Sequence, residues 1–251
     1  MFESKTGILF IAGVGFFVFA FLSNGALPML MYKDLPEQTA EEVVNPRLIR
    51  QFRNLQERYP AAFQQAFGDL PEEKMVSPAA SDGERERAES ENAHLRELVT
   101  EKAAEALRLG RQIYIGEGCW HCHSQFVRPV SNESLRFGPV SKTPEYQNEL
   151  QRPVMFGTRR VGPDLSREGG RRASDWHAVH FFRPTLVSTG SPMPEYPWLF
   201  HLGDPDPITK QPTFNSPNRR GLALITYIQW LGSWHETYPY YEELAEARGE
   251  D

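Results

Sequence analysis

The residues best suited to chemistry are two cysteines and a histidine in the stretch GCWHCH at 118–123. Cys119 and Cys122 are separated by two residues, and His123 follows directly. This spacing is typical of c-type haem attachment, in which each thiol adds to one haem vinyl group and the histidine is the proximal ligand of the iron. Because the chain has only two cysteines, it lacks the thiolates of a four-cysteine zinc or iron–sulfur site. We expect one covalent haem c, and a redox C-x-x-C or a simple disulfide is the weaker alternative.

The second axial ligand of such a haem has five candidates, which are Met155, Met193, His177, His180 and His201. Met193 lies between two prolines, 70 residues after His123, in the order that His/Met cytochromes use. Such ligation leaves no open position on the iron, so it predicts electron transfer rather than substrate chemistry. We expect Met155 to be a core residue, and the pair His177 and His180 to be buried, hydrogen-bonding histidines.

Further contacts to the haem are predicted between residues 159 and 163. A Gly-Pro pair at this place in cytochromes c offers a carbonyl to the Nδ1–H of the ligand histidine, which assigns that role to Pro163. Arg159 and Arg160 are expected partners for haem propionates or for an acidic protein face. Taken alone, the string Gly-Pro-Asp-Leu indicates an ordinary turn. Only its position in the chain, after the attachment motif, indicates a contact with the ligand histidine.

The charge distribution narrows the class of protein. The chain of 251 residues has a net charge of −6, with 16 acidic and 9 basic residues between 34 and 105. Residues 110–175 carry 10 basic and 7 acidic side chains. The basic residues are interspersed with acidic ones and form no long basic stripe. Nucleic-acid binding therefore has little support.

The first 33 residues contain a candidate membrane anchor. Residues 6–32 carry no charge, and a helix of that length exceeds a hydrocarbon core of roughly 30 Å. We expect one transmembrane helix that ends near Pro28; the alternative is a signal peptide cleaved before Ala26. The haem sets the orientation, because covalent attachment takes place on the outer side of a bacterial cytoplasmic membrane, which places the haem domain on the periplasmic side.

Residues 33–102 are interpreted as a polar, partly helical connector. Apolar residues recur at helical spacing from Leu48 to Tyr59. The charged run at 84–105 predicts a solvated helix or a partly disordered arm, with a docking arm for a partner subunit as the alternative.

The folded domain is expected at 103–235, followed by an acidic tail at 236–251. Apolar residues at helical spacing from Ala103 to Tyr114 deliver the chain into the motif, and Gly110 would allow a close helix crossing. The crossing partner is a helix capped by Asn218 and ended by Gly232. The predicted fold class is all-α: one N-terminal transmembrane helix, then a class I-like cytochrome c domain with long loops.

Together these segments resemble subunit II of the cbb3-type (C-type) haem-copper oxidases, a membrane-anchored monohaem cytochrome c. The matching strings are GRQIY at 110–114, CWHCHSQ at 119–125, Arg128-Pro129, GTRRVGPDL at 157–165, DWH at 175–177 with His180, and MPEYPWL at 193–199. The resemblance implies that Cys119, Cys122, His123 and Met193 contact the haem.

The resemblance also implies partners. Electrons would come from a dihaem cytochrome c subunit or a soluble cytochrome c, and would pass to the catalytic haem-copper subunit that reduces oxygen in the bacterial inner membrane. The chain would not be catalytic alone. Three alternatives stay open: a free-standing tethered shuttle cytochrome, the cytochrome subunit of a nitric oxide reductase, which the MPEYPWL run disfavours, and a thiol–disulfide enzyme.

Overall fold

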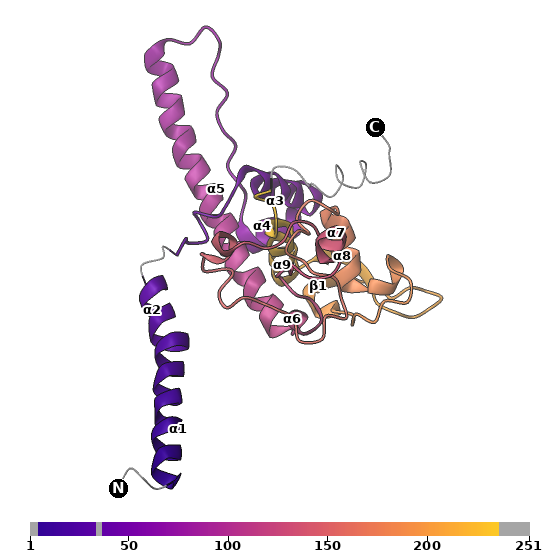
Figure 1. Cartoon of the computed structure of the whole chain (residues 1–251). Helices are drawn as coiled ribbons and strands as arrows, with labels where there is room; N and C mark the ends of the chain where they lie inside the picture. Colours follow the sequence, from indigo (N-terminus) through magenta and orange to yellow (C-terminus); the bar gives the residue numbers. More distant parts are fainter. Residues whose placement is uncertain (1–4, 34–36, 236–251) are drawn as a thin grey trace, which may run out of the picture. The chain divides into compact units, whose positions relative to one another are not determined.

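The computed structural model describes residues 5–33 and 37–235, and it divides the chain into two compact units. The first unit is Met1–Glu37 and the second is Gln38–Asp251 (Figure 1). The expected acidic tail at 236–251 lies outside the described residues.

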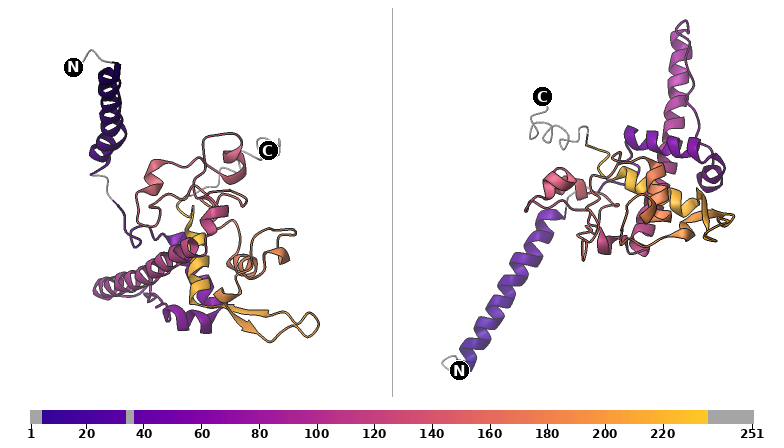
Figure 2. Two further views of the ribbon diagram at one scale, coloured as in Figure 1. Left: turned by 90° about the horizontal axis from the view of Figure 1, so that it is seen from below. Right: turned by 90° about the vertical axis from the view of Figure 1, so that its right-hand side faces the viewer.

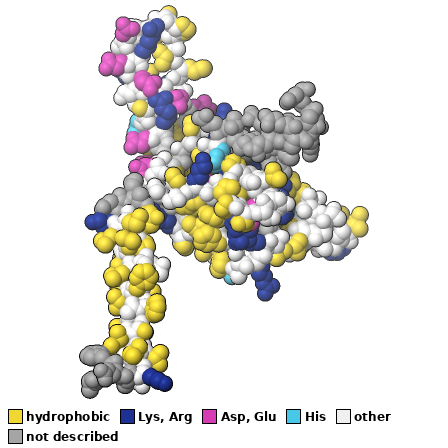
Figure 3. Space-filling view, in the orientation of Figure 1, with side chains coloured by type: hydrophobic (Ala, Val, Ile, Leu, Met, Phe, Trp, Pro, Cys, Tyr) yellow, Lys and Arg dark blue, Asp and Glu magenta, His cyan; other side chains and the backbone are white. Residues whose placement is uncertain are grey.

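The first unit is one apolar helical segment, Lys5–Tyr32, which is long and apolar enough to cross a membrane. It consists of α1 (Lys5–Phe21), a π-helical turn (Leu22–Ala26) and α2 (Leu27–Tyr32). Figure 3 shows hydrophobic side chains along its length. The helix was expected to end near Pro28, but it continues to Tyr32. Proline lacks an N–H and its ring crowds the preceding turn, and the wider π turn directly before it accommodates this residue in the second position of α2.

The start of the second unit packs as part of its core. Asn45 caps α3 (Pro46–Arg58) by accepting a hydrogen bond from the backbone N–H of Leu48. Phe52 of α3 meets Phe63 of α4 (Pro60–Phe67) edge to face, with ring centroids 4.8 Å apart. Both helices contact the C-terminal helix α9. Residues 38–70, which the sequence places in a polar connector, therefore share one hydrophobic core with the haem motif.

The charged run forms the first half of a single 35-residue helix, α5 (Asp82–Gly116). Its N-terminus carries a capping box between Ser81 and Glu84. The side chain of Asn92 pairs with both backbone groups of Lys74 in the preceding extended segment, at 2.7 and 3.0 Å. This half extends away from the rest of its unit in Figures 1 and 2. The expectation of a solvated helix is met, and the helix runs without interruption into the haem motif.

The C-terminal half of α5 crosses α9 (Arg219–Trp230), as the sequence predicts. A Cβ at Gly110 would lie 2.2 Å from the carbonyl oxygen of Ala223 and 2.6 Å from Cβ of Tyr227. Asn218 caps α9 through the N–H groups of Arg220 and Gly221. The absent side chain at position 110 thus sets how closely the two helices approach.

The remaining elements are short and are joined by long loops. They are α6 (Cys119–Cys122), α7 (Glu133–Phe137), α8 (Ser174–Phe182), three 3₁₀ turns (Thr143–Tyr146, Pro184–Leu186 and Pro197–Leu199), and strands β1 (Phe200–Gly203) and β2 (Thr213–Pro217). The two strands pair antiparallel, with an irregular register between His201 and Leu202. The all-α expectation is confirmed, with this hairpin as the one addition within the described residues.

Candidate functional site

The attachment motif forms a single helical turn at the end of α5. Gly118 adopts a left-handed conformation (φ +72°), which turns the chain from α5 into α6. Cys119 and Cys122 lie three residues apart on this turn, and both are free thiols at half-buried positions. Burial is the main cause that raises the pKa of the Cys119 thiol to about 12. A protonated, buried thiol is a poor nucleophile, so this site does not resemble that of a thiol–disulfide enzyme.

His123 follows the turn and is fixed at both its ring and its backbone. Its Nδ1 donates to the carbonyl oxygen of Pro163 at 2.9 Å, the contact expected from the Gly-Pro pair. The hydroxyl of Tyr114 on α5 donates to the His123 carbonyl at 3.1 Å. Burial lowers the pKa of His123, which favours a neutral imidazole. With Nδ1 engaged as a donor, Nε2 is left as the basic nitrogen that can ligate a metal.

The loop 155–165 lies along residues 121–125 and is joined to them by backbone hydrogen bonds. Gly162 donates to Cys122 at 3.0 Å, and Arg159 donates to His121 at 2.9 Å. Further bonds join Leu165 to Ser124 and Gln125 to Met155. With the bond from Thr158 to His121, five such bonds connect the loop to residues 121–125. They fix the backbone on both sides of His123 and thereby the position of its ring.

Gly162 makes the close approach of this loop possible. A Cβ at this position would lie 2.3 Å from Cε1 and 2.6 Å from Nδ1 of His123. Any side chain there would therefore push the imidazole out of its place. The glycine of the Gly-Pro pair is required because no side chain fits beside the imidazole, and the proline supplies the carbonyl that accepts the hydrogen bond.

Two polar side chains that the sequence analysis did not single out support the proximal side. The buried carboxylate of Asp164 accepts from the Ser124 hydroxyl at 2.5 Å and from the backbone N–H of Phe126 at 2.8 Å. Asp164 also accepts from the N–H of Ser166. The sequence signal for this role was the aspartate of the Gly-Pro-Asp-Leu string, because a buried carboxylate needs hydrogen-bond donors around it.

The two arginines expected at the haem take different positions. Arg160 forms a two-pronged ion pair with Glu133, and its Nε donates to Ser124 Oγ at 3.0 Å. Its guanidinium therefore braces the proximal loop. Arg159 has an exposed side chain, and its backbone N–H is part of the loop pairing.

Met193 lies in a separate loop that reaches the site through Tyr196. Its side chain is half-buried and packs against the core. The backbone N–H of Tyr196 donates to the carbonyl of Phe181 on α8 at 2.9 Å, and the Tyr196 side chain is close enough to Cys119 to influence the pKa of the thiol. The loop that carries Met193 is thus joined to α8 and passes near the first cysteine of the motif.

The other candidate axial ligands lie in three different settings. Met155 packs against the core, and its carbonyl belongs to the proximal loop. His201 is exposed on β1. His177 and His180 lie on α8, and each has one buried ring nitrogen without a hydrogen-bond partner.

These side chains fit a c-type haem. Two free thiols one helical turn apart could attach the vinyl groups. An imidazole oriented by a carbonyl and a methionine thioether on a nearby loop could supply the two axial ligands of the iron. No cluster of three or more His, Cys, Asp or Glu side chains that could hold a metal ion occurs within residues 5–33 and 37–235.

Comparison with protein families identifies the part of the chain that carries the motif. Residues 92–211 match the family model of the cytochrome c oxidase mono-haem subunit, FixO, and no curated protein matches the chain. The matched segment contains the second half of α5, the motif Cys119–His123, the loop 155–165, α8 and Met193. This finding confirms the family that the sequence strings indicate. Residues 92–211 are therefore similar to the mono-haem cytochrome c oxidase subunits of the FixO family, and this similarity supports the resemblance to cbb3-type oxidases.

Proposed function

We propose that this chain holds one haem c, bound covalently by Cys119 and Cys122, and that it passes electrons to the catalytic haem-copper subunit of the oxidase. His123 and Met193 are the proposed axial ligands. The observation that carries the proposal is the 2.9 Å hydrogen bond from His123 Nδ1 to Pro163, at the end of a loop that is paired to the motif. Both partners lie in the family-matched segment.

The haem supplies one-electron exchange, and His/Met ligation raises its reduction potential relative to two histidines. The chain's own residues hold and shield the group. The Pro163 carbonyl fixes the tautomer of His123, and Asp164 holds the adjoining backbone. Tyr114, which bonds to the His123 carbonyl, and Tyr227 are both buried, with ring centroids 5.7 Å apart.

The membrane-spanning helix is proposed to anchor the haem unit at the outer face of a bacterial inner membrane. Its length and composition support an anchor, and covalent haem attachment would take place on the outer side. The proposed donor is a dihaem cytochrome c subunit or a soluble cytochrome c.

The first experiment is purification of the tagged full chain from its native membrane in mild detergent. We expect haem c to co-purify with haem b and copper, and oxygen uptake when a reduced cytochrome c is supplied. The matched control is the Cys119→Ser, Cys122→Ser double variant, which should lack covalent haem.

Two results would contradict the proposal. Haem c without haem b or copper, while other respiratory complexes stay intact, would favour a free-standing tethered shuttle. Covalent haem in the double variant would overturn the attachment sites themselves.

A further inference from the structure

Helix α8 carries a buried histidine nitrogen that the site described above does not use. The Nδ1 atom of His180 is buried and has no hydrogen-bond partner among the described residues. A buried imidazole nitrogen without a hydrogen-bond partner costs free energy of folding. Such a group in a native protein calls for an acceptor or donor supplied from outside the chain.

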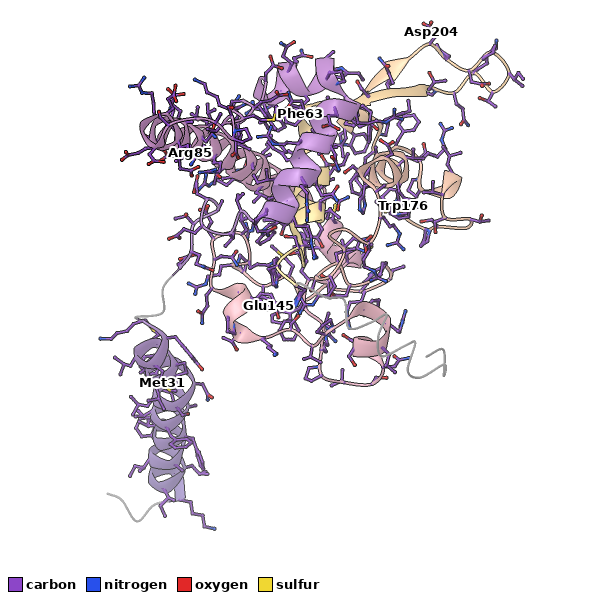
Figure 4. All side chains as sticks on the ribbon, turned by 90° about the horizontal axis from the view of Figure 1, so that it is seen from above. Met31, Phe63, Arg85, Glu145, Trp176 and Asp204 are labelled. Carbon is purple, nitrogen blue, oxygen red and sulfur yellow. The ribbon has the colours of Figure 1, made fainter. Side chains whose placement is uncertain are left out.

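The His180 ring is held in a defined orientation. It stacks on the Trp176 indole, with centroids 4.4 Å apart and planes 16° apart. The Arg172 guanidinium lies 4.3 Å from the centroid of the same indole. Trp176 is labelled in Figure 4. Because Arg172 is also bound to the buried Glu168 at 2.6 Å, the stack is anchored to the backbone loop that precedes the helix.

His180 lies on the helix to which the Met193 loop is joined. Phe181, the next residue, accepts the backbone hydrogen bond from Tyr196 of the Met193 loop. The buried Nδ1 atom of His180 therefore belongs to an element that adjoins the loop of the proposed distal ligand.

The acceptors that a c-type haem offers are its two propionate carboxylates. Arg160, one of the two arginines expected to meet them, is paired with Glu133. A neutral imidazole has one N–H and can place it on Nδ1. Hydrogen bonds to ionised carboxylates are roughly twice as strong as those between neutral groups, so a single imidazole donor is sufficient to orient one propionate.

We propose that His180 donates a hydrogen bond from Nδ1 to a haem propionate, with Trp176 and Arg172 as its positioning residues. This inference rests on the proposed function, because it needs the covalent haem. It assigns His180 a contact with the haem that is independent of Met193. Covalent attachment through the cysteines allows the contact to be removed without loss of the haem.

The test compares His180→Phe, which keeps a ring but has no donor, with His180→Asn, which keeps a short N–H donor. His201→Phe on the exposed hairpin is the matched control. Resonance Raman spectra of each haem-loaded full chain report the propionate bending mode, whose frequency falls when a hydrogen bond is lost. Potentiometric titration of the same samples reports the reduction potential.

We expect the propionate mode to shift downward in His180→Phe, to be restored in His180→Asn, and to be unchanged in His201→Phe. The potential of His180→Phe should fall, because the propionate charge is no longer partly neutralised. An unchanged mode in haem-loaded His180→Phe overturns the inference, and so does loss of the distal axial ligand in that variant. Absence of covalent haem in the unmodified chain would instead contradict the proposed function.

Discussion

The two sides of the proposed haem site are built differently. The proximal side is a length of chain held by paired backbone hydrogen bonds and by the buried Asp164, so that the His123 ring has one position. On the other side, the Met193 loop has fewer hydrogen bonds to the rest of the structure. Ser191 bonds to Ser188 and Met193 to the Ser191 hydroxyl within the loop, while Tyr196 bonds to Phe181 and Glu195 pairs with Arg183. The proposed proximal ligand is fixed by its surroundings over several residues, whereas the proposed distal ligand is held mainly at the C-terminal end of its loop.

This difference has a physical meaning for the stability of the two ligands. If one hydrogen bond on the proximal side is lost, several others still hold the imidazole. An added side-chain atom beside the ring cannot be accommodated, because this side is closely packed. The Met193 loop can move with the loss of few contacts, and local opening is easiest where few contacts are made. We therefore expect mutations on the proximal side to affect haem loading and folding, and mutations of Met193 to affect the properties of the iron.

The largest effect is expected from Gly162→Ala. The added Cβ would lie 2.3 Å from the His123 ring. Overpacking of this kind costs about 1–3 kcal/mol, and about 1.4 kcal/mol already corresponds to a tenfold change in an equilibrium. Covalent haem per polypeptide, measured by the pyridine haemochrome spectrum, should fall about tenfold. Gly116→Ala, where a Cβ meets nothing within 4 Å, is the control; equal haem content in both variants would show that the proximal side is not tightly packed.

Asp164→Ala should give the next largest effect. It leaves the donors on Ser124, Phe126 and Ser166 without their acceptor, and buried unsatisfied groups of this kind cost about 1–3 kcal/mol. Denaturant unfolding of the haem-loaded chain should show a loss of about 2–4 kcal/mol. Asp204→Ala on the exposed hairpin should change the free energy of unfolding by less than about 0.5 kcal/mol.

Met193→Ala tests the proposed distal side. The haem should stay attached through the cysteines, while the reduction potential falls by on the order of 0.1 V, within the roughly 0.8 V range that axial ligands cover. The methionine-to-iron charge-transfer band should disappear. Met75→Ala, at a side chain that is 99% exposed, should leave both unchanged, and a retained band in Met193→Ala would remove Met193 from the ligand set.

Acid should weaken the proximal side through Glu133. Its ion pair with Arg160 is the first cause that lowers the pKa of the Glu133 carboxyl below its ordinary value of about 4.5. The pair therefore contributes stability above that value, and this contribution is lost as the pH falls through the lower, folded-state pKa. Glu133→Gln should make the acid limb of the stability curve shallower, and Glu84→Gln, at the exposed start of α5, should change it less. Identical acid limbs for Glu133→Gln and the unmodified chain would contradict the assignment.

Local patterns in the sequence were sufficient for the motif, the capped helix α9 and the Gly110 crossing. Each of these depends on residues within one or two helical turns, or on the absence of a side chain at a single crossing point. The contact between His123 and Pro163 was also within reach, because the order of segments indicated it.

Contacts between distant segments could not be read in the same way. Nothing near Arg160 in the chain identifies Glu133 as its partner, and the pairing depends on how the loop folds back. The burial of Phe52 and Phe63 required knowing that α3 and α4 meet α9. Long-range packing of this kind has no local signature, so the sequence suggested a connector where the structure has a part of the core.

The π turn at Leu22–Ala26 changes the register of the apolar N-terminal helical segment. A single π turn is equivalent to one extra residue in an α-helix, and one residue corresponds to about 100° of rotation at 3.6 residues per turn. A line of side chains that follows one face of α1 is therefore continued on α2 about a quarter of a turn away. In effect, the segment carries an insertion of one residue, and its two halves present different faces in the same direction.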